Sequence, residues 1–195
     1  MSSNFAKFQS ANQTQAAWIK YNADKGNSFA LSLYQAVEKY GNLTVRQAEA
    51  VNRNVQSEVS RARHEMQAPP VSQDKLMQAF DTARQNKLIR LKIRFDGFFC
   101  YPASEHSQNV GAIYVKNSET KEYLGKIQNG RFVKSRDCSE AIAAGVVKVM
   151  SDPLAEAIAY GKQTGDCAIC GRFLENPESV ARGIGPICAA KYGFA

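Results

Sequence analysis

Residues 165–195, GDCAICGRFLENPESVARGIGPICAAKYGFA, hold three of the chain's five cysteines. Cys167 and Cys170 have C-x-x-C spacing, which lets two thiolates approach one ion from a tight turn. Cys188 follows Pro186, a residue that suits the first position of a helix. A cysteine in a first helical turn is favoured as the thiolate, which is the form that binds a metal. This stretch therefore predicts a treble-clef-like zinc knuckle.

A closed structural zinc site needs four ligands, and this stretch supplies three. Cys138 is the preferred fourth ligand, because it is a thiol near the exit of the predicted sheet. Cys100, His106 and Asp166 are the alternatives. A competing interpretation is that the cysteines are free or simply packed. The odd number of cysteines, with three of them clustered, favours a metal over disulfides in a reducing compartment.

The sequence indicates no enzyme active site. Zinc deaminases carry H-x-E ahead of P-C-x-x-C, whereas Ser107 and Gln108 follow His106 and no proline precedes Cys167. The chain has two histidines and lacks both an H-E-x-x-H motif and a P-loop. Nothing in the pattern orients Cys100 and His106 as a nucleophile and its base. We expect a protein without catalytic activity of its own.

Ahead of the cysteines the sequence predicts a small antiparallel sheet. Four segments predict strands by alternation of side chains: 88–95, 111–116, 122–128 and 131–135. Asn129 and Gly130 separate the last two strands, and an Asn-Gly pair in this position is typical of a two-residue hairpin. Such a turn pairs Ile127 with Phe132 on one face. Residues 98–101 read as core or sheet.

The alternation puts cations on the open face of this sheet. The net charge of +7 is concentrated in residues 84–136, which hold eleven Lys or Arg and four Asp or Glu. The residues expected to contact phosphates are Arg90, Lys92, Arg94, Lys116, Lys126 and Arg131. Tyr114, Tyr123 and Phe132 are candidates for stacking on bases, although half or more of this set must fill the core. The alternative reading is a solvated basic face without a partner.

Helices are predicted on both sides of the sheet in the sequence. Residues 4–63 predict a helical hairpin or bundle, in which Gly41 ends one helix and Thr44 caps the next through Gln47. Further helices are predicted over 74–85, 139–150 and 153–161. Asp152 is the expected cap of the last of these.

These elements predict an α+β fold in four parts. Residues 1–66 form the helical region and 67–73 a linker that contains two prolines. Residues 74–136 form a helix and the antiparallel sheet with its basic face. Residues 137–195 form helices and the zinc element.

The stretch DPLAEAIAYGKQTGDCAICGRFLENPESVARGIGPICAAKYG, residues 152–193, resembles an uncharacterised family found in phage and plasmid proteins and attached to some Swi/Snf-type helicases. The shared pattern is a DP–YG helix, then CxxCGRxL, then S-x-x-x-GxGPxC. The resemblance extends back to about residue 88, and residues 32–51 are similar to segments that accompany the family. It implies zinc and a phage or mobile-element setting, and it supplies no reaction.

Composition narrows the setting of the protein. No apolar run approaches the ~18 residues of a membrane span, and the first residues lack the cationic and apolar pattern of a secretory signal. We expect a cytoplasmic protein, in the host cytoplasm if it is phage-encoded.

Two functions are consistent with this sequence. The first is a zinc-binding module that binds DNA or RNA without strong sequence preference, through the basic sheet. The alternative is a protein-interaction factor that docks on a host enzyme and modulates it. The concentration of charge in the predicted sheet favours the first.

Overall fold

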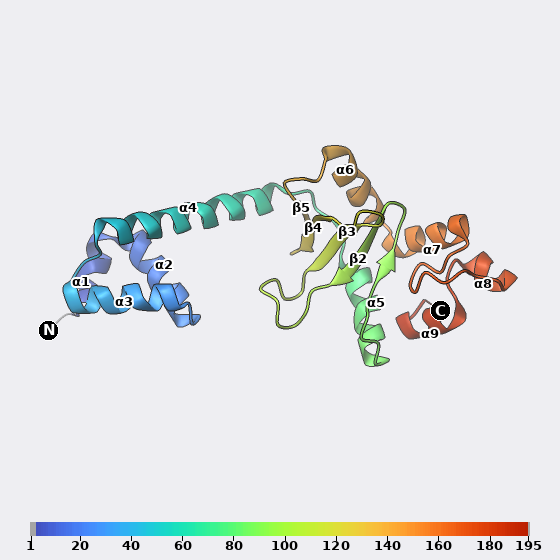
Figure 1. Ribbon diagram of the computed structural model, residues 1–195, viewed down its shortest axis with the longest axis horizontal. Helices are drawn as coiled ribbons and strands as arrows, with labels where there is room; N and C mark the ends of the chain where they lie inside the picture. Colours follow the sequence, from blue (N-terminus) through green and yellow to red (C-terminus); the bar gives the residue numbers. More distant parts are fainter. Residues whose placement is uncertain (1–2, 195) are drawn as a thin grey trace. The chain divides into compact units, whose positions relative to one another are not determined.

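A computed structural model describes residues 3–194, and it divides the chain into two compact units at residues 64 and 65. Figure 1 shows the helices of the first unit and the sheet and helices of the second. Each unit has its own apolar core. Among the described residues, no helix combines the length and apolar character that crossing a bilayer requires.

The first unit is helical, as predicted. Its helices are α1 (Asn4–Ala11), α2 (Gln13–Asp24), α3 (Ser28–Tyr40) and α4 (Val45–Gln67), the last of which runs into the second unit. Gly41 ends α3 in the left-handed conformation at φ 79°. The Gln47 amide donates to the Thr44 hydroxyl, and the Thr44 amide donates to the Gln47 side chain. The capping box is therefore confirmed.

The second unit contains a five-stranded antiparallel sheet in simple sequence order. Its strands are β1 (Ile93–Arg94), β2 (Phe98–Pro102), β3 (Ile113–Asn117), β4 (Tyr123–Gln128) and β5 (Arg131–Lys134). Ile127 pairs with Phe132 across the last hairpin, as predicted. Asn129 and Gly130 both have positive φ, at 52° and 69°, as a type I′ turn requires.

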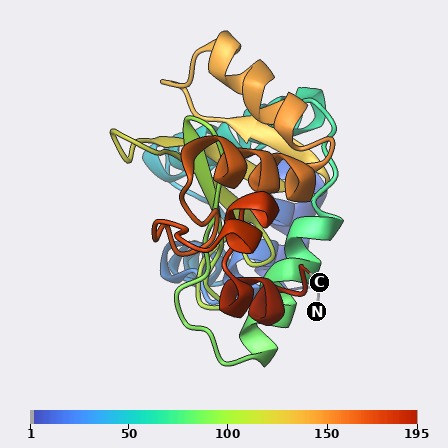
Figure 2. The ribbon, with the colours of Figure 1, turned by 90° about the vertical axis from the view of Figure 1, so that its right-hand side faces the viewer.

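Five helices share one apolar core with this sheet. They are α5 (Asp74–Gln85), α6 (Glu140–Val149), α7 (Pro153–Thr164), α8 (Pro177–Arg182) and α9 (Pro186–Tyr192). In Figure 2 the orange-to-red helices α7, α8 and α9 lie together. Cys100, Val115 and Ile127 of the sheet join the helices in one core. Phe132 also lies in that core, 1 % exposed, so it is unavailable for stacking on a base.

The predicted strand over 88–95 is wrong for most of its length. Only Ile93–Arg94 pairs as a strand, and Ile89 is 95 % exposed. Two backbone amides of this segment donate to residues distant in the sequence. The Lys92 amide donates to the Tyr192 hydroxyl over 3.0 Å, and the Arg94 amide donates to the Ala168 carbonyl over 2.7 Å. The segment therefore leaves the sheet and contacts the C-terminal element.

The linker at 67–73 and the cap residue Asp152 also differ from the prediction. The predicted linker pairs with the edge of β5, where the Val71 amide donates to Gly130 and the Phe132 amide donates to Pro69. This covers a sheet edge that would otherwise be open. Asp152 occupies the cap position of α7 without bonding its backbone, and its carboxylate instead pairs with Lys75 at 2.9 Å.

Candidate metal centre and nucleic-acid interface

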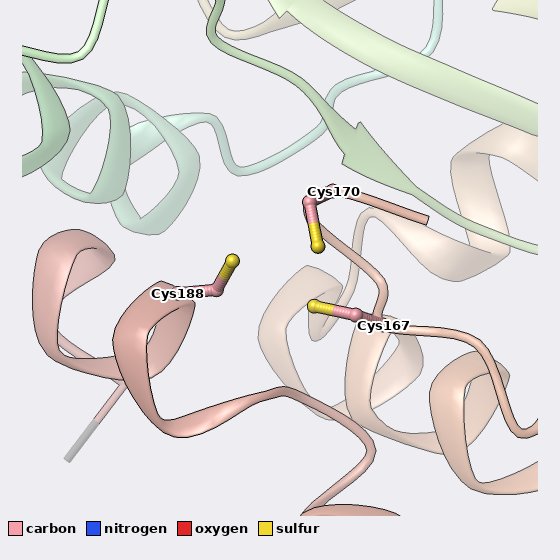
Figure 3. A group of neighbouring side chains, drawn as sticks. All are labelled: Cys167, Cys170 and Cys188. Carbon is pink, nitrogen blue, oxygen red and sulfur yellow. The ribbon is translucent and has the colours of Figure 1, made fainter. Parts of the chain in front are cut away.

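The three C-terminal cysteines converge on one point. Figure 3 shows the sulfur atoms of Cys167, Cys170 and Cys188 directed toward one another from the loop and from α9. All three Sγ atoms lie within 4.8 Å of each other. Cys167 is buried, Cys188 is half-buried and Cys170 is exposed, so the cluster is open on one side.

The loop that carries Cys167 and Cys170 is a tight hairpin. The Cys167 amide donates to the Arg172 carbonyl, and the Gly171 amide donates to the Cys167 carbonyl, both over 2.8 Å. Gly171 has φ 72°, a backbone conformation that residues other than glycine rarely adopt. Cys188 lies in the first turn of α9, behind Pro186, as the sequence predicts.

Two glycines bring the helices on either side of this loop together. A Cβ atom on Gly161 in α7 would lie 1.9 Å from the backbone oxygen of Gly183, which ends α8. A Cβ atom on Gly183 would lie 2.2 Å from the Ile158 oxygen. The Ala168 amide donates to the same Gly183 carbonyl. This backbone-to-backbone contact sets the position of the cysteine loop relative to the turn that leads into Cys188.

The thiols interact strongly because they are close and partly buried. A hydrogen bond with Cys188, assisted by backbone hydrogen bonds, lowers the pKa of Cys167 to about 4, although burial opposes this. The same hydrogen bond raises the pKa of Cys188, since losing its proton would place two thiolates side by side, and burial adds to the rise. A metal cation among the sulfurs removes this repulsion.

This set of donors fits a soft or borderline metal ion. Zinc–sulfur bonds of about 2.3 Å put the sulfurs of one tetrahedral site about 3.8 Å apart, and the three Sγ atoms here lie within 4.8 Å of one another. Thiolates favour zinc, copper(I) and iron–sulfur clusters over hard cations. Three cysteines close together can therefore hold a metal, and no other His, Cys, Asp or Glu among residues 3–194 joins their group.

Cys138, the preferred fourth ligand in the sequence analysis, lies elsewhere. It is buried before α6, and its sulfur contacts the Ser139 carbonyl. Cys100 is buried in β2, where burial raises the pKa of its thiol. His106 and Asp166 also lie outside the group of three. The prediction failed because nearness in sequence to the sheet does not bring a side chain to the loop at 167–170.

Three of the six predicted phosphate ligands bind other parts of the protein instead. The Arg94 side chain donates to the Ile169 carbonyl, and its guanidinium lies against Gly171. Lys126 forms an ion pair with Glu65 at 3.2 Å. The Arg131 side chain donates to the Ala68 carbonyl over 2.6 Å. These cations are neutralised or already bonded, which makes them poor phosphate ligands.

The other three cations surround a row of aromatic rings on the outer face of the sheet. The rings of Phe99, Tyr101, Tyr114 and Tyr123 follow one another at centroid distances of 6.0, 5.5 and 6.0 Å. Lys92 lies 4.2 Å above the Phe99 ring, and Lys116 lies 5.9 Å from the Tyr101 ring. Arg90 is exposed at the rim.

Sequence reasoning missed Phe99 and Tyr101, and also Lys121, which lies 5.7 Å from the Phe99 ring. The run FFCYP has apolar or aromatic side chains at successive positions, so its alternation is invisible without the paired strands. The register pairs Tyr101 with Tyr114 and Phe99 with Lys116, which places these four side chains on the same face. Lys121 lies between β3 and β4 and follows no strand pattern.

A groove of about 1200 Å³ lies beside these rings. The segment 87–92 forms part of its wall, and Tyr101, Tyr114 and residues 102–105 also line it. The groove is lined by five cations and by a single acid, Glu105. Partial burial, which is the largest cause, together with the neighbouring charges of Arg94, Lys121 and Lys116 lowers the pKa of Lys92.

Comparison with known proteins assigns no activity to the chain. Residues 157–193, from within α7 to just past α9, match a family of unknown function (DUF6011). The match contains the three converging cysteines and the Gly161–Gly183 contact. No curated protein and no solved structure matches the chain.

Proposed function

We propose that this chain is a non-catalytic, zinc-binding module that binds nucleic acid on the outer face of its sheet. The observation that carries the proposal is the row of aromatic rings flanked by Lys92, Lys116 and Lys121, beside a groove with one acid among five cations. None of these three lysines takes part in an ion pair within the described chain. Phosphates supply the missing negative charge.

In this proposal zinc stabilises the wall of the groove. The Arg94 amide donates to the Ala168 carbonyl in the cysteine loop, and the Lys92 amide donates to the Tyr192 hydroxyl in α9. Cys167, Cys170 and Cys188 would hold the ion, which joins the loop to α9. The segment that carries Arg90 and Lys92 is therefore hydrogen-bonded at one point to the cysteine loop and at another to α9.

The resemblance to phage and plasmid proteins supports an accessory role for the module in a mobile element. The three free thiols of the cluster suit the reducing cytoplasm of a host cell.

The test of the proposed function is binding of the full chain, purified without chelator, to labelled DNA and RNA at low salt. Elemental analysis of the same protein measures its zinc content. We expect binding and about one zinc per chain. Absence of binding to every nucleic acid at low salt would refute the nucleic-acid function.

One feature favours the alternative, docking on a host protein. Phe173 and Ile187 are 70 % and 71 % exposed, and both line a cleft of about 500 Å³ at the open side of the cysteines. Exposed apolar side chains beside a rigid site are common in protein interfaces. If nucleic acid fails to bind, co-purification of a host protein by the wild type and its loss in Phe173→Ser would favour this alternative.

A further inference from the structure

We infer that the groove beside the aromatic rings binds single-stranded nucleic acid, with separate bases stacked on Tyr101, Tyr114 and Tyr123. This inference rests on the proposed nucleic-acid function and names the form of its ligand. It is carried by the accessibility of the rings, by their mutual tilt and by the position of the cations.

The three tyrosines differ from Phe99 in being accessible. Phe99 is 7 % exposed and lies beneath Lys92, whereas Tyr123 is 42 % exposed. Tyr101 and Tyr114 are half-buried and line the groove. An aromatic ring that keeps part of its surface in water, next to cations, is available to stack on a base.

The tilt of the rings decides between a single strand and a duplex. The planes of Tyr101 and Tyr114 meet at 45°, and those of Tyr114 and Tyr123 at 70°. Bases that lie flat on such rings cannot also lie flat on each other. A duplex keeps its bases stacked and offers only their edges in the grooves. The arrangement therefore requires bases that have left the stack, as in a single strand.

The cations lie where the backbone of such a strand would run. Lys116 stands opposite Phe99 on β3, close to the Tyr101 ring, and Lys92 and Arg90 come from the wall of the groove. Lys126, at the far side of Tyr114, is already paired with Glu65. Phosphates are thus attracted to the β1–β2–β3 side, while the tyrosines extend from β2 to β4.

The surroundings of the tyrosine hydroxyls bear on how selective the stacking would be. Tyr114 accepts a hydrogen bond from the Asn109 amide, so its hydroxyl is partly engaged within the protein. Burial raises the pKa of Tyr101, and it raises that of Tyr123 to about 12, so both rings are neutral at physiological pH. A neutral ring surface accepts every base, which predicts weak sequence preference.

The test compares four labelled 12-mers on the zinc-loaded full chain: single-stranded oligothymidine, single-stranded oligouridine, a DNA duplex, and a backbone of abasic sites. We expect the single strands to bind at least tenfold more tightly than the duplex and the abasic strand. The two single strands separate DNA from RNA as the source of the bases. Equal binding of all four would overturn the inference while leaving the proposed function intact, whereas no binding at all would refute both.

Variants locate the bases on the rings. Tyr101→Leu and Tyr114→Leu should each weaken single-strand binding roughly 5- to 150-fold, the range for the loss of one stacked base. Tyr101→Phe should retain binding, because it keeps the ring. Phe173→Leu removes an exposed ring beside the cysteines and should leave binding unchanged. Zinc content and thermal unfolding check that each variant folds. The abasic strand tests the need for bases on the unaltered protein, without any substitution.

Discussion

Replacing Gly161 with alanine tests whether the contact between α7 and the end of α8 shapes the metal site. The new Cβ would lie 1.9 Å from the Gly183 oxygen, 2.6 Å from its carbonyl carbon and 2.8 Å from its Cα. All three neighbours are backbone atoms, so no side chain can rotate away. Carbon and oxygen atoms in ordinary contact lie about 3.5 Å apart, so the two segments must separate by roughly 1.5 Å.

The expected magnitude combines two opposing effects. Overpacking of this kind costs about 1–3 kcal/mol, while alanine in a helix gains about 0.5–1 kcal/mol over glycine. We therefore expect Gly161→Ala to lower the free energy of unfolding by about 1 kcal/mol, and by about 2.5 kcal/mol at most. Gly145→Ala is the matched control, because a Cβ there meets nothing within 4 Å in α6. It should raise stability by about 0.5–1 kcal/mol.

Thermal unfolding of the zinc-loaded full chain measures both changes, and competition with a chelator measures metal affinity. Gly161→Ala should weaken zinc binding as well as stability, because the Gly183 carbonyl also accepts the Ala168 amide beside Cys167. Gly145→Ala should leave zinc affinity unchanged. If the two alanine variants shift stability in the same direction and bind zinc equally, the account of the α7–α8 contact is wrong.

Three further predictions concern the metal site and catalysis. Cys188→Ser should lose the zinc and Cys138→Ser should keep it, because of these two residues only Cys188 lies with Cys167 and Cys170. Elemental analysis of both variants measures this, and loss of zinc from both would restore Cys138 as a ligand. Arg94→Gln should lower zinc affinity roughly 10- to 100-fold in a chelator competition, because the arginine supports the loop at Ile169, and unchanged affinity would contradict that role. Purified protein should show no hydrolase, nuclease or transferase turnover, and an activity abolished by one point substitution would overturn this expectation.

Features set by neighbouring residues were predictable from the sequence. The Asn129–Gly130 hairpin, the Thr44–Gln47 capping box and the helix start before Cys188 each depend on side chains within a few positions of one another. Their energetics are local, so the pattern of residues is sufficient to predict them.

Features set by distant partners were not predictable in the same way. Arg94 alternates with apolar residues as an exposed strand residue would, yet it bonds a loop about seventy-five positions later. Lys126 follows the strand pattern correctly, but its charge is neutralised by Glu65, sixty-one positions earlier in the sequence. Alternation predicts which face a side chain takes and contains no information about which distant residue meets it there.

The most direct test of the central claim is the salt dependence of single-strand binding. Each phosphate contact contributes about −0.7 to the slope of log affinity against log salt on a single strand. Lys92→Gln with Lys116→Gln removes two charges from the groove and should flatten the slope by about 1.4, with weaker binding. Lys148→Gln with Lys162→Gln removes two exposed charges from α6 and α7 and should leave the slope unchanged. Equal slopes for the wild type and both double variants would contradict the assignment of this face to nucleic acid.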